Sequence, residues 1–423
     1  MADLRTKFRQ LTRVFDPIYR PEQDLTGGRG TSYVPETHED YRKQLDAALD
    51  LNDNVKLLVA GQPGCGKTTM LRYLAHELRQ AGRIVAFVDL EAQTAVQHLD
   101  SVEMYIAALA ELLTETKRSG ASLSAETLSA CQGLVAQLQS GMEIPAEPGA
   151  IAGLLQRQLA AVRSDNALRD ELRLMVKQGS EHDPFLLLSR ALEDLNGRRP
   201  VIILDGLDKL PPPRARQTFL DNEKKPMAEA RGAAILTIPL SVVYEPTFNV
   251  LSERYNNADS AVLPAVRLWD FDKDKRLRTL SEKGSKILRK IVSARVDPID
   301  PKIVMPEAIE RAIIASGGNI RELARFVQAS VIKAHVRHGS FIEAVDIEAA
   351  IADQRESFRR AYDPRFRSLL ERVRTEYRLD DSSDVAKQLL YGLWVTEYRN
   401  GIAWYSLPDP VEQLLRHLER TDS

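Results

Sequence analysis

A short glycine-rich stretch, GQPGCGKTT at residues 61–69, constrains this chain more than any other feature. It follows an apolar run at residues 57–60 and precedes a helix-like run from Met70 to Leu78. Glycine lets the main chain turn tightly and bring its N–H groups close to an anion, and the positive end of the following helix adds to that attraction. A lysine and a threonine at the end of such a turn suit phosphate and Mg²⁺. The stretch therefore predicts a loop that binds the phosphates of a nucleotide.

All nine residues of this loop are candidate nucleotide-binding residues: Gly61, Gln62, Pro63, Gly64, Cys65, Gly66, Lys67, Thr68 and Thr69. Lys67 is expected to reach the β- and γ-phosphates, and the Thr68 hydroxyl is a candidate ligand of Mg²⁺. Cys65 is expected to be a small filler of the loop, not a nucleophile.

The second half of such a site is expected at a buried strand that ends in a carboxylate. The run VIILD places Asp205 directly after the β-branched stretch Val201–Leu204. A continuous apolar run of this length is typical of a strand buried on both faces of a parallel sheet. Ligands bind beyond the carboxyl ends of such strands, so Asp205 is a candidate for holding Mg²⁺ directly or through water. The alternative is a strand-to-turn aspartate without a ligand.

Further strand-like runs follow at residues 83–90, 233–239 and 261–268. Together with the runs at 57–60 and 201–204 they predict a doubly wound α/β core with five parallel strands. The residues from about 97 to 197 show helical spacing of their apolar positions, which indicates an unusually long helical insertion.

Composition excludes several classes of protein. A chain of 423 residues is expected to form two or three domains, and its 43% hydrophobic content is ordinary for a folded soluble protein. No apolar run approaches the length of a membrane span, and the first residues lack the apolar core of a signal peptide. Two cysteines suggest no disulfide framework, and a net charge of −2 argues against coating nucleic acid by charge alone. A cytoplasmic protein is therefore expected.

Beyond residue 270 the chain changes character, and residues 271–355 are predicted to be all-helical, with helices at 273–293, 306–316, 319–336 and 342–351. Asn319 followed by Glu322 is typical of a helix N-cap. Arg321, at the start of that helix, can fold over a bound nucleotide and report its γ-phosphate. Residues 270–340 contain 15 Lys or Arg against 9 Asp or Glu, which indicates either a solvated basic face or a surface for DNA.

The last segment, residues 356–423, predicts helices followed by a hairpin. Its turn is Arg399-Asn400-Gly401, and Asn-Gly is a strong hairpin signal. This pattern looks like a winged-helix module. The candidate recognition helix at 383–390 offers only Lys387 to DNA, so a protein-facing or intramolecular role is favoured.

The loop, the strand ending in Asp205, Thr237 at the end of the fourth strand and the GGNIREL helix together resemble the AAA+ and STAND-like branch of P-loop ATPases. Within that branch the chain looks like bacterial ATPases related to origin-recognition and STAND switch proteins. The resemblance covers residues 33–355 and implies an ATP–Mg²⁺ site. In that site Lys67 and Thr68 contact phosphates and metal, Asp205 holds the metal, and Thr237 and Arg321 act as sensors. The alternative for Thr237 is a strand-end threonine with only a structural role.

The patterns along the sequence divide the chain into an arm at 1–55, a P-loop core at 56–270, a helical lid at 271–355 and a winged-helix-like domain at 356–423. The resemblance also suggests which other residues act. The stretch before the first strand of such ATPases often lies near adenine, which makes Tyr33, Val34 and Pro35 candidates for base contacts or an ordinary connection. The candidates for an arginine finger acting in trans are Arg214, Arg216 and Arg254.

One position departs from the pattern of many AAA+ proteins, in which a glutamate directly follows the metal-binding aspartate. This chain has Gly206 there, and the next acid is Asp208, as in the D-G-x-D of STAND-type sequences. Asp208 is therefore the candidate for positioning water, with a structural turn carboxylate as the alternative. A displaced carboxylate of this kind predicts slow hydrolysis.

Two functions follow from these observations. The first is a slowly hydrolysing ATPase that acts as a nucleotide-dependent switch, forms a homo-oligomer on ATP binding and controls a protein partner, in a bacterial defence or mobile-element system. The alternative is a DNA-associated AAA+ loader or transposition-type regulator. A nucleotide kinase ranks last because it lacks the DGLD strand and the arginine-bearing lid helix.

Overall fold

The computed structural model of the chain describes residues 2–17, 33–138, 144–176, 180–220, 227–257, 260–272, 277–379 and 383–422. The chain forms two compact units. The sheet unit comprises Asp40–Ala60 and Leu71–Val262, and the lid unit comprises Met1–Glu39, Gly61–Met70 and Leu263–Ser423. Residues 18–32 of the predicted N-terminal arm lie outside the described residues. The boundaries of the four domains drawn from the sequence remain predictions.

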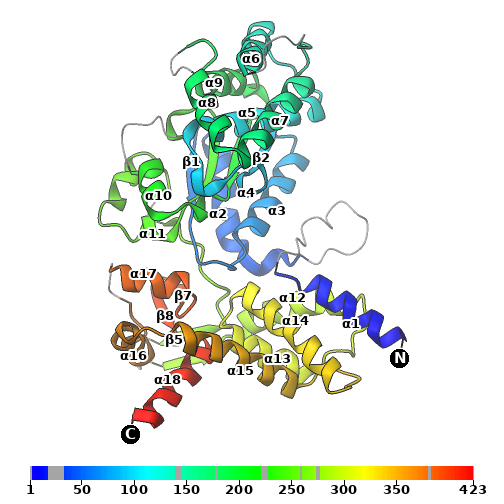
Figure 1. The fold of residues 1–423 in the computed structure, drawn as a ribbon, viewed down its shortest axis with the longest axis vertical. Helices are drawn as coiled ribbons and strands as arrows, with labels where there is room; N and C mark the ends of the chain where they lie inside the picture. Colours follow the sequence, from blue (N-terminus) through cyan, green and yellow to red (C-terminus); the bar gives the residue numbers. More distant parts are fainter. Residues whose placement is uncertain are drawn as a thin grey trace. The chain divides into compact units, whose positions relative to one another are not determined.

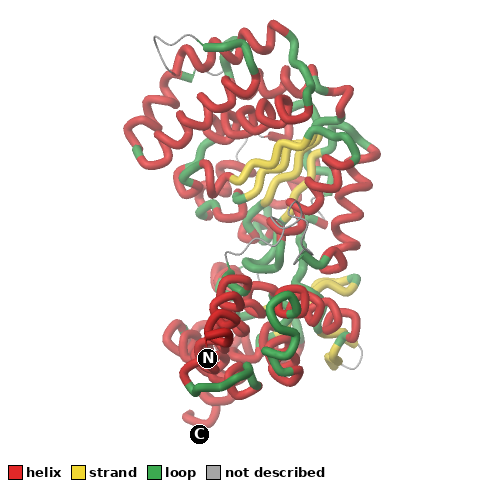
Figure 2. The backbone as a smooth tube through the Cα atoms, turned by 90° about the vertical axis from the view of Figure 1, so that its right-hand side faces the viewer, coloured by secondary structure: helices red, strands yellow, loops and turns green. Residues whose placement is uncertain are grey.

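A parallel sheet of four strands, in the order β1-β4-β3-β2, forms the centre of the sheet unit. Its strands are β1 (Lys56–Val59), β2 (Val85–Asp89), β3 (Val201–Asp205) and β4 (Ala233–Thr237). All residues of β1, β3 and β4 are buried, which explains their continuous apolar character. The strands lie side by side with helices to either side of them in Figure 2. This arrangement confirms the predicted α/β class.

The prediction of a fifth parallel strand at residues 261–268 is wrong, because the sheet has four strands among the described residues. A single parallel bridge joins Ala60 to Val262, and the Ala60 N–H donates to the Ala261 carbonyl at 2.8 Å. Further along the predicted strand, the Ala265 N–H donates to the Glu397 carbonyl at 3.2 Å and the Val266 N–H to the Gly318 carbonyl at 3.1 Å, so these residues pair within the lid unit and form no strand of this sheet.

Ten α-helices lie between residues 39 and 243 within the described part of the chain. They are α2 (Glu39–Leu51), α3 (Lys67–Gln80), α4 (Leu90–Gln93), α5 (Ser101–Ser119), α6 (Ala125–Leu138), α7 (Pro148–Ser164), α8 (Asn166–Met175), α9 (Pro184–Asp194), α10 (Pro212–Phe219) and α11 (Leu240–Val243). Helices α5 to α9 form the predicted insertion, whose described residues contain no strand. Pro184 opens α9, as expected from its fixed backbone angle and missing N–H.

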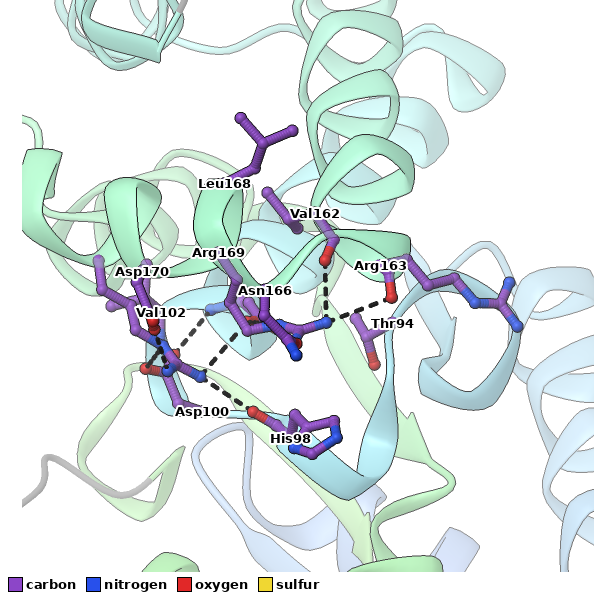
Figure 3. A network of polar contacts seen from close by, with 12 residues as sticks. Thr94, His98, Asp100, Val102, Val162, Arg163, Asn166, Leu168, Arg169 and Asp170 are labelled. Atoms are coloured by element: carbon purple, nitrogen blue, oxygen red, sulfur yellow. Dashed lines mark hydrogen bonds and ion pairs between the residues drawn. The ribbon is translucent and has the colours of Figure 1, made fainter.

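A buried polar network joins α5 to α8 inside the insertion (Figure 3). The Glu103 carboxylate lies 2.9 Å from the Arg169 guanidinium, and these side chains are only 1% and 2% exposed. Arg169 also donates to the Val162 carbonyl at 2.8 Å, and Arg173 pairs with Asp100 at 2.6 Å. Burial raises the pKa of Glu103 to about 7, and Asp100 adds to the rise while both arginines oppose it. This network fixes two helices of the insertion against each other.

The lid unit is mainly helical. Its N-terminal helix is α1 (Ala2–Val14), and its lid helices are α12 (Glu282–Val296), α13 (Pro306–Ser316), α14 (Ile320–Val336) and α15 (Ala344–Ala361). Figure 1 shows α12 to α15 gathered in one bundle with α1 alongside. Their apolar faces form one hydrophobic core, to which Phe8 and Leu11 of α1 contribute.

The helix predicted from residue 273 is wrong at its start. An antiparallel pair, β5 (Trp269–Asp272) and β6 (Leu277–Leu280), comes first. Helix α12 begins only after Ser281, whose hydroxyl accepts a hydrogen bond from the Gly284 N–H. Residues 273–276 lie outside the described residues.

The C-terminal module, residues 367–422, contains three helices and a hairpin. Its elements are α16 (Arg367–Glu376), α17 (Asp384–Tyr391), β7 (Thr396–Asn400), β8 (Ile402–Ser406) and α18 (Asp409–Asp422). The hairpin turns at Gly401, whose φ of +78° explains the Asn-Gly signal. Tyr398 and Trp404 stack at 4.6 Å within the core of the lid unit, so these aromatics pack inside the protein.

Among the described residues, no helix is both long and apolar enough to cross a membrane.

Candidate functional site

The phosphate loop, Gly61–Thr69, connects β1 to α3, as the sequence predicts. Helix α3 begins at Lys67, so Lys67 and Thr68 lie in its first turn, where N–H groups have no acceptor within the helix. Gly64 has φ of +84°, and a Cβ atom added there would overlap the Cβ of Arg321. Only glycine therefore fits this turn without displacing its neighbour.

Lys67 lies against the loop to which it belongs. Its Nζ donates to the Gly61 carbonyl at 2.8 Å and to the Gln62 carbonyl at 3.2 Å, and the residue is 6% exposed. These carbonyl dipoles stabilise the ammonium in a buried position. A phosphate group that takes up Lys67 must therefore replace these two acceptors.

The N-terminus of α14 packs directly on the phosphate loop within the lid unit. The Arg321 N–H donates to the Gly64 carbonyl at 3.2 Å, and the Asn319 amide donates to the Pro63 carbonyl at 2.9 Å. Asn319 also caps α14, because its Oδ1 accepts from the N–H groups of Arg321 and Glu322. The predicted N-cap is confirmed, and Arg321 starts beside the loop. Among the described residues, its guanidinium forms no hydrogen bond or ion pair.

His38 is a loop neighbour that the sequence reasoning missed. Its Nε2 lies 2.6 Å from the Cys65 carbonyl, which can only accept, so Nε2 carries the proton. Burial lowers the pKa of His38 to about 4, and the hydrogen bond to Cys65 opposes this shift only in part. A neutral His38 therefore holds the main chain at Cys65. The sequence offers no signal beyond a histidine shortly before α2.

The carboxylate edge of the sheet unit, where its parallel strands end, carries the other predicted residues. Asp205 is the last residue of β3 and pairs in register with Asp89 of β2. Thr237 ends β4 and pairs in register with Val59, two residues before the phosphate loop begins. The strand leading into the loop and the strand bearing Asp205 therefore end at the same edge of one sheet.

The turn after Asp205 explains the departure at residue 206. Gly206 has φ of +102°, and a Cβ atom there would lie 3.3 Å from the Glu91 nitrogen. A glutamate in this place would be strained, because residues with a side chain rarely adopt that angle. The acid is therefore displaced to Asp208, in the short turn Leu207–Lys209.

Thr237 fastens this turn. Its Oγ1 accepts from the N–H groups of Gly206 at 3.0 Å and Asp208 at 3.4 Å. The same hydroxyl donates to the Leu204 carbonyl at 3.3 Å. One hydrogen and two lone pairs are thus taken up, which is the full capacity of a hydroxyl group.

The donor set of the predicted metal site suits Mg²⁺, because carboxylate and hydroxyl oxygens are the ligands that this ion prefers. Asp205 is a buried carboxylate, 5% exposed, at the end of β3. Thr68 offers its hydroxyl from the first turn of α3. Among the described residues, no group of three or more His, Cys, Asp or Glu forms a metal-binding cluster. A metal here therefore requires additional ligands, such as phosphate oxygens and water.

The structure also places the candidates for base contact and for an arginine finger. Val34 belongs to the core of the lid unit, and Pro35 opens a short 3-10 turn. Arg214 and Arg216 lie on α10, where Arg216 pairs with Glu245 at 3.8 Å. Arg254 follows the 3-10 turn Phe248–Glu253. The functions predicted for these residues remain predictions.

Residues 39–220 match the family model of the KAP family P-loop domain. Comparison of the sequence with curated proteins finds no match.

Among solved structures, the chain is similar to Cdc6p from Pyrobaculum aerophilum, with 13% identity, a TM-score of 0.42 and 96% of each chain covered. It is also similar to the Aeropyrum pernix ORC1 protein in complex with DNA, with 14% identity, a TM-score of 0.36, and coverage of 96% of this chain and 99% of that one. For Drosophila ORC bound to DNA the identity is 12%, the TM-score 0.35, and the coverage 98% of this chain and 92% of that one. The family match and the loop between β1 and α3 together identify a P-loop NTPase domain in this chain.

Proposed function

We propose that this protein is an ATP-binding and slowly hydrolysing P-loop ATPase that acts as a nucleotide-dependent switch. The phosphate loop binds the triphosphate through Lys67 and the positive N-terminal end of α3. Thr68 and Asp205 would hold Mg²⁺, which would neutralise phosphate charge. Support comes from the family match and from the shared edge at which β1 and β3 end.

The switch part of the proposal rests on one observation: the first turn of α14 contacts the phosphate loop at Pro63 and Gly64. A helix that touches the loop responds to any movement that a nucleotide causes there. Arg321 begins in this contact, and its guanidinium can pair with a γ-phosphate. ATP and ADP would then hold the lid helix differently.

Hydrolysis in this proposal depends on Asp208. Gly206 leaves no acid next to Asp205, and Asp208 is half-exposed in a turn that Thr237 fixes through two N–H groups. Asp208 can orient a water molecule from this turn. Thr237 acts by positioning the turn. Homo-oligomer formation on ATP binding and a protein partner remain predictions from the sequence.

The experiment compares Arg321→Ala with Arg325→Ala, a matched control one turn further along α14. Arg325 is exposed and pairs with Glu322 at 2.9 Å, away from the loop contact. Affinities for ADP and for a slowly hydrolysed ATP analogue are measured for each variant by titration calorimetry.

Arg321→Ala is expected to lose about tenfold or more of the preference for the triphosphate, because one charge-assisted hydrogen bond contributes about 1.5–3 kcal/mol. Arg325→Ala should keep the wild-type preference. An unchanged ratio of the two affinities in Arg321→Ala would show that the lid helix does not read the γ-phosphate.

A further inference from the structure

The side chain of Gln62 connects the phosphate loop to the C-terminal module. Its Nε2 donates to the carbonyls of Leu390 at 3.0 Å and Val395 at 2.6 Å. Its Oε1 accepts from the Glu397 N–H at 2.8 Å. Both partners of Nε2 are acceptors and the partner of Oε1 is a donor, so the orientation of this amide follows from its surroundings.

The contact between Gln62 and the C-terminal module is buried. Gln62 is 3% exposed and Glu397 is 5% exposed, so water cannot replace the three hydrogen bonds freely. A loop binds phosphate through its main-chain N–H groups and needs no side chain at this position for that purpose. The side chain of Gln62 instead contacts the C-terminal module. The module contacts the loop through main-chain atoms at the end of α17 and the start of β7.

The same module also contacts the turn that starts α14. The Tyr398 hydroxyl donates to the Gly317 carbonyl, and a Cβ atom on Gly317 would lie 3.3 Å from the Thr396 hydroxyl. Asn319, two residues after Gly317, returns to the loop at Pro63. The loop, the start of α14 and strand β7 therefore contact one another in pairs and form a closed ring of hydrogen bonds.

Lys67 links this ring to nucleotide binding. The Lys67 Nζ donates to the carbonyls of Gly61 and Gln62. Gln62 therefore holds the Lys67 ammonium through its main chain and the C-terminal module through its side chain. When Lys67 turns to a phosphate, these carbonyls lose their cation. Any movement of the main chain at Gln62 that follows is opposed by the three hydrogen bonds of its side chain.

From these contacts we propose that Gln62 is a positioning residue through which the C-terminal module sets the nucleotide affinity of the phosphate loop. The hydrogen bonds of the Gln62 side chain stabilise the loop conformation in which Lys67 donates to the Gly61 and Gln62 carbonyls. Nucleotide binding weakens these hydrogen bonds of Gln62. The inference rests on the proposed nucleotide binding. It adds that the phosphate loop is coupled to the C-terminal module of the same chain. Because coupling between two sites is reciprocal, breaking the Gln62 contact strengthens nucleotide binding by the factor by which nucleotide weakens the contact.

The test uses the full chain and the variant Gln62→Met, which keeps the side-chain volume and removes all three hydrogen bonds. Gln328→Met is the matched control, because the Gln328 amide donates to a main-chain carbonyl, that of Thr12, at 3.0 Å within the same unit. The affinity for ATP with Mg²⁺ and the hydrogen exchange of the Glu397 N–H are measured for all three proteins.

In the wild type, ATP is expected to speed exchange at Glu397, and Gln62→Met should bind ATP about tenfold more tightly. In Gln62→Met the Glu397 N–H should exchange fast with and without ATP. Gln328→Met should behave like the wild type in both measurements.

Equal or weaker ATP binding by Gln62→Met would overturn the inference, because a residue that only shapes the loop loses affinity when it is removed. Unchanged exchange at Glu397 in a wild type that binds ATP would also overturn it and leave the proposed function intact. A wild type that binds no nucleotide would overturn both proposals together.

Discussion

At the scale of single residues, Thr237 shows how one buried hydroxyl holds the turn after Asp205. Thr237 is fully buried, and its Oγ1 is the acceptor for two N–H groups of that turn. Thr237→Val keeps the shape and leaves those N–H groups without this acceptor. Its free energy of unfolding in urea is expected to fall by about 1–3 kcal/mol, and ATP hydrolysis should slow because Asp208 is no longer fixed.

Thr237→Ser is the matched control, because it keeps the hydroxyl and loses one methyl group, which costs about 0.8 kcal/mol. It should retain most of the hydrolysis rate. If Thr237→Val unfolds at the same urea concentration and hydrolyses ATP at the same rate as the wild type, the hydroxyl does not hold this turn.

The sequence predicts those site residues whose chemistry is local. Lys67 and Thr68 follow a glycine pattern with a known spacing, and Asp205 ends an apolar run, so short windows suffice. Gln62 could be placed in the loop, but its partners lie more than 300 residues away, at Leu390 and beyond. The contact of His38 with Cys65 likewise depends on packing between distant segments. No spacing rule predicts such contacts.

At the scale of helices, the pair Glu103–Arg169 predicts how the insertion responds to substitution. Arg169→Met leaves the Glu103 carboxylate buried without its nearest cation, and breaking a buried pair in this way costs about 3–5 kcal/mol. Glu103→Met/Arg169→Met removes both charges and should recover much of this loss. Unfolding in urea measures both changes.

The loss in Arg169→Met should depend on pH. Burial already raises the pKa of Glu103 in the folded state to about 7, above its ordinary value of 4.5. A raised pKa gives stability that is present below the unfolded value and is lost as pH rises through the folded value. Arg169→Met should therefore be less damaging at pH 5 than at pH 8. Equal losses at both pH values, or a double variant as unstable as the single one, would contradict this account.

The boundaries of elements could be predicted where a single residue determines them. Helix α13 runs from Pro306 to Ser316, as expected, because proline suits the first helical position and Gly317 takes the left-handed angle after the end. Strand β5 was missed because residues 269–276 are rich in charge, which does not distinguish a helix from an exposed strand. The fifth strand was overpredicted because an apolar pattern does not reveal that Ala265 and Val266 bond to the distant Glu397 and Gly318 carbonyls.

At the scale of the whole molecule, the order of the elements along the chain does not determine which unit each segment packs with. Residues 61–70 pack with the lid unit, although the strand before them belongs to the sheet unit. A pattern of strands and helices predicts the α/β class, since it follows from local periodicity. It does not predict which unit the loop packs with, because that depends on contacts with α14 and β7 far along the chain.

The account as a whole depends on the binding of Mg²⁺-ATP by the phosphate loop and the carboxylate of Asp205. Titration calorimetry of the full chain with ATP tests this, with Lys67→Ala and Asp205→Asn as variants and with Mg²⁺ present or replaced by a chelator. Circular dichroism confirms that each variant is folded.

The wild type should bind one ATP per chain, and Lys67→Ala should weaken binding by about 100-fold, equivalent to about 2.7 kcal/mol. Asp205→Asn should weaken binding when Mg²⁺ is present and differ little from the wild type in chelator. A folded wild type that binds no adenine nucleotide, or a Lys67→Ala variant that binds ATP as tightly as the wild type, would contradict the account.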